Sequence, residues 1–261
     1  MTDADHPSAA STEGARPIRD LFRRDGRSML AAAVVTLAII LGLYFSGRSA
    51  GVGPPHATVA ALAAGTLWLA LACPILAAGG RGALSALARG GIVADAGAVA
   101  LLVLWAARRF AGPRGPCLTF RGAVQIYCTF VAVALVQVAA ARCPRSRAWR
   151  YVAGVAAAVV MTALLATPFW VSGPVSVAGP HKNTVVAAAV YLNPFYSVTS
   201  AVVEQTRFIW HESGAMYEMS RLFDYAPPPV RWYTAAVIYG LLAAILAATH
   251  LVRTKKIRTI D

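Results

Sequence analysis

The chain has 261 residues, of which 58% are hydrophobic and only 13% are charged. A water-soluble globule of this length needs more polar side chains to cover its surface, so the composition excludes an ordinary soluble domain and predicts an integral membrane protein. The formal net charge of +13 could suit a protein that binds nucleic acid, but the basic residues flank apolar segments, which is typical of membrane proteins beside anionic head groups.

The chain begins with a polar stretch and a short basic segment. Residues 1–16 carry no apolar period, so we expect a disordered tail. Between residues 17 and 28, Ile18, Leu21 and Phe22 recur at helical spacing with arginines on the other faces. This pattern predicts an amphipathic helix at the cytoplasmic surface of the membrane, and the alternative is a merely basic flank of the first span.

Six apolar runs of near membrane-spanning length follow, and none shows the period of two that is typical of a transmembrane β-strand. They cover residues 29–45, 58–78, 92–107, 123–141, 151–171 and 232–252. About 20 residues at about 1.5 Å rise per residue cross a hydrocarbon core about 30 Å thick. We therefore expect an all-α membrane protein in which residues 17–261 form one domain with about six transmembrane helices.

The basic residues predict an orientation. If the N-terminus lies in the cytoplasm, the cytoplasmic segments carry fifteen lysines and arginines and the outer segments carry nine. The positive-inside rule then predicts that both termini are cytoplasmic. Arg108, Arg109, Arg114 and Arg121 are the exception, because they would lie outside. The strong preference for arginine over lysine and the many alanines suggest a GC-rich bacterial genome, so the expected location is a bacterial inner membrane.

The segment between the fifth and sixth spans, residues 172–231, is long and partly apolar. Its apolar stretch over 184–192 ends at Asn193-Pro194, and Asn followed by Pro is a helix-start signal. Because nine apolar residues are too few to cross a membrane, we expect a stretch that dips in and out, followed by a helix. The alternative is a seventh span over residues 185–203, kinked at Asn193-Pro194.

The same segment holds the only concentrated set of ionisable side chains. Glu204, His211 and Glu218 are seven residues apart, which places them on one helix face, and Arg207 and Arg221 lie beside the two glutamates. Such a face could carry a metal or a catalytic group. The zinc-protease pattern HExxH is absent, however, and charges three residues apart more often stabilise a solvated helix. We therefore expect no metal and no cofactor.

A few polar residues lie within the predicted spans. Asp95 is the only acidic one, and it is either a functional group such as a proton relay or a residue near the head groups that pairs with Arg89. Gln125 and Gln137 are expected to join helices by hydrogen bonds rather than to bind a substrate.

Three segments together point to a known family: residues 18–27 (IRDLFRRDGR), 81–87 (RGALSAL) and 192–195 (LNPF). They are similar to the amphipathic connecting helix, the RGxLxxL docking segment and the outer Leu-Asn-Pro element of type-2 ABC exporter permeases. The chain resembles this family over nearly its whole length. It departs from the family at Gly80, where a glutamate usually precedes the arginine of the docking segment.

The resemblance implies a transport subunit without catalytic residues. Two permeases, identical or different, would pair in the bilayer, and a separate ABC-type ATPase would dock on Arg81, Gly82, Leu84 and Leu87. The sequence agrees with a separate ATPase, because no lysine precedes Ser or Thr as a phosphate-binding GxxxxGK[ST] loop requires. Two alternatives stay open: a membrane enzyme that uses the Glu204, His211 and Glu218 cluster, and a structural subunit of a larger membrane complex.

Overall fold

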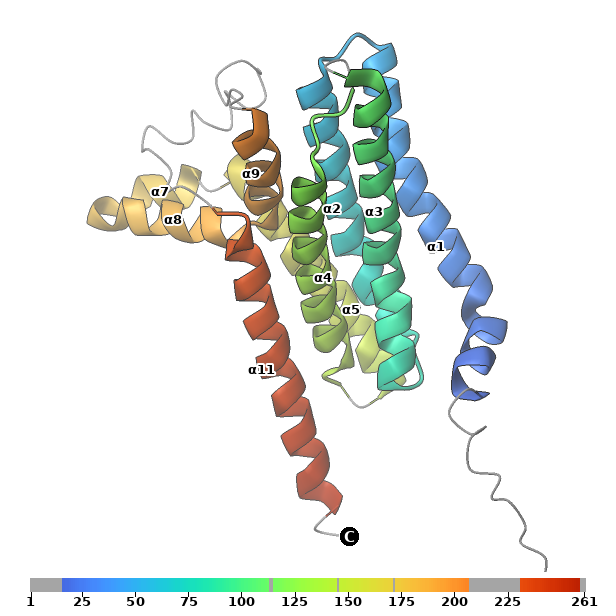
Figure 1. Cartoon of the computed structure of the whole chain (residues 1–261). Coiled ribbons are helices and arrows are strands. Elements are labelled where there is room, and N and C mark those ends of the chain that lie inside the picture. The colour runs from blue at the N-terminus through green and yellow to red at the C-terminus, as the bar shows by residue number, and fades with distance from the viewer. Residues whose placement is uncertain (1–15, 113–114, 145, 171, 207–230, 259–261) are drawn as a thin grey trace, which may run out of the picture.

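The computed structural model describes residues 16–112, 115–144, 146–170, 172–206 and 231–258. In these residues every regular element is a helix, and six helices are long and apolar enough to cross a membrane (Figure 1). They are α1 (Arg16–Ser49), α2 (Pro54–Ala78), α3 (Ala83–Ala111), α4 (Phe120–Arg142), α5 (Arg147–Leu165) and α11 (Tyr233–Arg258). The protein is a multi-pass helical membrane protein, and the predicted fold class is confirmed.

Shorter helices lie between α5 and α11 in the chain. They are α6 (Thr167–Trp170), α7 (Ser172–Val177), a 3-10 turn (Gly179–His181), α8 (Lys182–Leu192) and α9 (Pro194–Thr206). The part of the predicted outer helix beyond residue 206 and residues 1–15 of the predicted 1–16 tail lie outside the described residues.

Several helix boundaries differ from the predicted ones, and three of them have a physical reason. α1 is continuous from Arg16, so the predicted surface helix and the first span form one helix. α3 begins at Ala83, nine residues before the predicted start, because the intervening alanines and leucines favour a helix and no proline interrupts them. α5 ends at Leu165 rather than at residue 171, since Pro168 cannot donate a helical hydrogen bond.

The two ends of the bundle differ in the chain termini and helix connections found there. Figure 1 shows that α1 begins and α11 finishes at the same end, which we call the terminal end. The α2–α3 and α4–α5 connections also lie there, and the α1–α2 and α3–α4 connections lie at the other end, which we call the link end. The cytoplasmic location of the terminal end stays a prediction.

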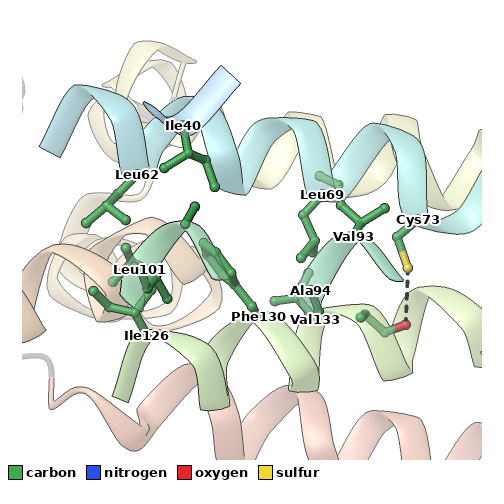
Figure 2. Close-up of a cluster of buried hydrophobic side chains, with 14 of the residues drawn as sticks. Ile40, Leu62, Leu69, Cys73, Val93, Ala94, Leu101, Ile126, Phe130 and Val133 are labelled. Carbon is green, nitrogen blue, oxygen red and sulfur yellow. Dashed lines mark hydrogen bonds between the residues drawn. The ribbon is translucent and has the colours of Figure 1, made fainter. Parts of the chain in front are cut away.

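The core lies where α2, α3 and α4 meet, with Phe130 of α4 at its centre. Figure 2 shows Ile40, Leu62, Leu101 and Ile126 around this ring, and all five side chains are fully buried. The ring lies directly against the backbone of α3, since a Cβ at Gly97 would come within 2.9 Å of it. Small residues thus let the central helices approach closely, as is usual in membrane bundles.

The outer helices α5 and α11 each leave an apolar face that the rest of the bundle does not cover. Of the most apolar window of α4, 56% is buried, compared with 17% for α5 and for α11. Valines of α5 such as Val155 and Val159 and aliphatic residues of α11 such as Ile245 are exposed. Lipid solvates such side chains as well as a protein core does, so these faces suit the bilayer.

α8 and α9 form a broken pair beside the bundle. They are bent by 73° at a break between Leu192 and Pro194, and Figure 1 shows α8 crossing the direction of the long spans. Val186 and Val190 of α8 pack with Val175 and Tyr196 in a small cluster separate from the main core. The bent pair fits both predicted arrangements, a re-entrant stretch and a seventh span kinked at this point. The bend lies at the Asn193-Pro194 pair that marks the predicted helix start.

Candidate functional site

The α2–α3 turn places the residues of the predicted docking segment at the surface of the terminal end. Arg81 and Gly82 are exposed, and Gly82 is the N-cap of α3. The side chains of Leu84 and Leu87, three residues apart on the first turns of α3, are 60% and 43% exposed. Two leucines on one helix face therefore stand at the end of the bundle beside a positive charge.

Close packing fixes this turn. Arg142 at the end of α4 donates a hydrogen bond from Nη1 to the carbonyl oxygen of Gly80, 3.1 Å away. A Cβ at Gly80 would lie 2.6 Å from the backbone nitrogen of Ala86, so no other residue fits without movement of α3. The packing of this turn therefore requires glycine at position 80.

Asn193 occupies the break between α8 and α9 and is fully buried. Its Oδ1 accepts a hydrogen bond from the backbone N–H of Phe195 at 2.9 Å, which caps the start of α9. Its Nδ2 donates to Thr167 Oγ1 at 3.0 Å and to the carbonyl oxygen of Leu165 at 3.3 Å. One amide side chain thus joins the start of α9 to the end of α5.

The end of α5 is completed by side chains as well as by the backbone N–H of Ala166. The carbonyl oxygen of Leu164 accepts from Thr167 Oγ1 at 2.8 Å, and that of Ala163 accepts from Trp170 Nε1 at 2.8 Å. Pro168 has no N–H to offer to Leu164, and the Thr167 hydroxyl and the Ala166 N–H donate to this carbonyl instead. In an apolar surrounding each unpaired carbonyl would be costly, which explains this concentration of polar side chains.

α11 is tied to the same region. Tyr239 donates from its hydroxyl to the carbonyl oxygen of Leu192, the last residue of α8. The backbone N–H of Ala235 donates to Ser197 Oγ in α9 at 3.2 Å. Together with Asn193, these contacts connect α5, α8, α9 and α11 at one break in the backbone.

Asp95 lies near the middle of α3, on the outer face of the bundle. It follows Ala83 by twelve residues, or about 18 Å along the helix axis, because α3 starts earlier than predicted. Its exposed carboxylate accepts a hydrogen bond from the Tyr127 hydroxyl of α4 at 3.0 Å, at a shallow pocket between the two helices. A carboxylate near the middle of a membrane span is energetically costly in lipid. A functional role for Asp95 therefore stays a prediction.

The two buried glutamines connect helices. Gln137 donates from Nε2 to the carbonyl oxygen of Ala70 in α2, at 3.4 Å. Gln125, with its amide oxygen facing the donors, accepts from Arg121 Nε at 3.3 Å and from Trp232 Nε1 at 3.2 Å. The second contact joins α4 to the residue that precedes α11.

The ionisable cluster of the predicted outer helix lies beyond the side chains that the structure describes. Glu204 lies in α9, but its side chain is outside the described part of the chain, as are His211 and Glu218. Among the described residues, no three His, Cys, Asp or Glu side chains lie close enough together to hold a metal ion.

No family model, curated protein or solved structure matches the chain. The assignment to membrane proteins therefore rests on the six apolar helices. The chain is an integral membrane protein of about six spans.

Sequence reasoning missed several residues that organise this membrane protein. Thr167, Trp170 and Tyr239 complete the break around Asn193, and Pro74 determines the partner of Gln137. Pro74 and Pro168 were the available signals, because a proline inside or at the end of an apolar span leaves a carbonyl that another group must satisfy.

Proposed function

We propose that this protein is the membrane-spanning permease subunit of an ATP-driven exporter, in which a separate ABC-type ATPase hydrolyses ATP. The observation that carries the proposal is the exposed pair Leu84 and Leu87 on a closely packed turn at the terminal end. Arg81 and Arg89 flank the pair in sequence, which is typical of segments at the head-group level. Exposed leucines there are better covered by a protein partner than by water.

The proposed docking works through complementary chemistry. Leu84 and Leu87 would enter an apolar groove of the ATPase, and Arg81 would face acidic side chains there. Because Leu84 belongs to the same continuous helix as Asp95, a displacement of its first turn would be transmitted along α3 into the bundle. The exposed faces of α5 and α11 leave room for a second permease, identical or different, in the bilayer.

The test is purification from native membranes in mild detergent, followed by measurement of ATP hydrolysis in the purified fraction. We expect ATPase activity to accompany the wild-type chain. The double substitution Leu84→Asp with Leu87→Asp should remove most of it, because two buried carboxylates would each cost several kcal/mol at an apolar interface.

Phe110→Asp is the matched control. Phe110 lies on the same helix at the link end and is 91% exposed, so this change introduces a carboxylate without touching the proposed docking surface. Unchanged ATPase activity in the Leu84 and Leu87 variant would refute the proposal, as would its equal loss in the Phe110 variant when both chains elute as monodisperse protein.

A further inference from the structure

A cavity of about 690 Å³ opens at the link end, between the last turn of α3 and the first turn of α4. Three of the residues that line it are arginines: Arg108 and Arg109 from α3 and Arg121 from α4. Trp105 and Phe120 form part of the same wall, with their ring centroids 5.4 Å apart. The three arginines are among the four that depart from the predicted positive-inside pattern.

The charge of this cavity is not balanced by the described part of the chain. In the sequence, Asp95 is the only acidic residue between Arg27 and Glu204. It precedes Arg108 by thirteen residues on α3, which is about 20 Å along the helix axis. Three positively charged groups that line one cavity repel one another, which favours an anion in it.

Arg108 adds a second, independent observation. Its Nη1 is buried and donates no hydrogen bond to any acceptor in the described residues. Buried donors without an acceptor are rare, and each costs about 1–3 kcal/mol. An anion in the cavity that Arg108 lines would offset part of this cost through its attraction to the guanidinium group.

The other side chains that line the cavity also suit an anion. Arg109 lies with its guanidinium 5.9 Å from the centroid of the Trp105 ring, and stacking of this kind leaves the edge of the guanidinium available for hydrogen bonds. Thr119 caps α4 by accepting from the N–H of Gly122 at 3.1 Å. The start of this 23-residue helix therefore adds the partial positive charge of its first amides.

We propose that the arginine cavity, formed by Arg108, Arg109 and Arg121, binds a phosphate group. Guanidinium groups are well matched to phosphate oxygens, and aromatic rings such as Trp105 and Phe120 are typical of the membrane interface, where lipid phosphates lie. The phosphate can belong to the head group of an anionic lipid or to a soluble anion that enters from the aqueous side. The site does not depend on an ATPase partner.

The test uses the full-length chain in detergent and counts bound molecules by native mass spectrometry. Phosphatidylglycerol is titrated against phosphatidylcholine, and inorganic phosphate is added as a competitor. We expect phosphatidylglycerol or inorganic phosphate to bind, and the double substitution Arg108→Gln with Arg109→Gln to weaken binding about tenfold or more. Arg147→Gln, an exposed arginine at the start of α5 on the terminal end, is the control with the same chemistry.

The two sources of phosphate give different results. A phosphatidylglycerol adduct that millimolar inorganic phosphate does not displace identifies the lipid head group, and displacement by inorganic phosphate identifies a soluble anion; loss of either in the double variant supports the site. Equal binding of both lipids without an effect of phosphate, or equal binding by wild type and double variant, overturns it. Should the double variant aggregate, Arg109→Gln alone decides, because Arg109 is exposed.

Discussion

Gln137 of α4 supplies the hydrogen-bond donor that Pro74 withholds from α2. A helical carbonyl normally accepts from the N–H four residues later, and for Ala70 that residue is Pro74, which has none. The Nε2 group of Gln137 donates to this carbonyl from the neighbouring helix. The burial of Gln137 is therefore explained by the backbone hydrogen bond that α2 lacks at Pro74.

This relationship predicts a coupling between the two residues. Gln137→Leu should lower the free energy of unfolding in detergent by about 0.6–1.7 kcal/mol, the range for hydrogen bonds between membrane helices. In a Pro74→Ala background the same change should cost less, because the alanine N–H can reach Ala70. Chemical unfolding of the four chains gives the coupling energy, and a value of zero would contradict the explanation.

Asp95 should react from the bilayer side. Dicyclohexylcarbodiimide, which dissolves in lipid, is expected to modify the exposed Asp95 carboxyl, whereas a water-soluble carbodiimide should not. Tyr127→Phe removes the hydrogen bond to this carboxyl and should speed labelling by up to about tenfold.

Peptide mass spectrometry locates the Asp95 adduct, and Asp95→Asn is the control that should abolish it. Protection of Asp95 from the lipid-soluble reagent in native membranes, with labelling only after solubilisation, would show instead that another protein covers this face.

Asn193 should be among the most sensitive positions for stability. Asn193→Ala removes its bonds to Phe195, Thr167 and Leu165 at a fully buried position, so we expect a loss of about 1–3 kcal/mol in the free energy of unfolding. Asn193→Asp keeps the acceptor for Phe195 but loses both donated bonds, and it should not restore stability.

Asn183→Ala is the control for this measurement, because Asn183 lies on α8 and is exposed. Thermal unfolding in detergent should leave this variant near wild type. Equal melting temperatures for the Asn193 and Asn183 variants would mean that the break is held by other contacts.

Gly154 should be required for the contact of α5 with α2. A Cβ at this position would lie 2.8 Å from the carbonyl oxygen of Pro74, and a backbone atom cannot move aside as a flexible side chain can. Gly154→Ala is therefore expected to lower stability by about 1–3 kcal/mol. Gly91→Ala makes the same change where nothing lies within 4 Å, so its melting temperature should stay near wild type.

The fold class could be read from the sequence because it depends on local properties. Runs of about 20 apolar residues are stable across a bilayer only as helices, since each helix satisfies its own backbone. The Asn193-Pro194 pair likewise marks a helix start within the chain itself, and α9 begins at Pro194. The early start of α3 was missed because a hydropathy window does not count Ala83–Gly91 as part of a span.

Only the tertiary structure decided which polar groups meet. Gln137 and Pro74 are 63 residues apart in the sequence, and the arginine cavity unites the end of one helix with the start of the next. Such pairs depend on how helices pack in lipid, where close contact and hydrogen bonds between helices replace the hydrophobic effect. A single helix satisfies its own N–H groups, but where a proline interrupts it, the missing donor comes from whichever neighbour the packing brings within reach.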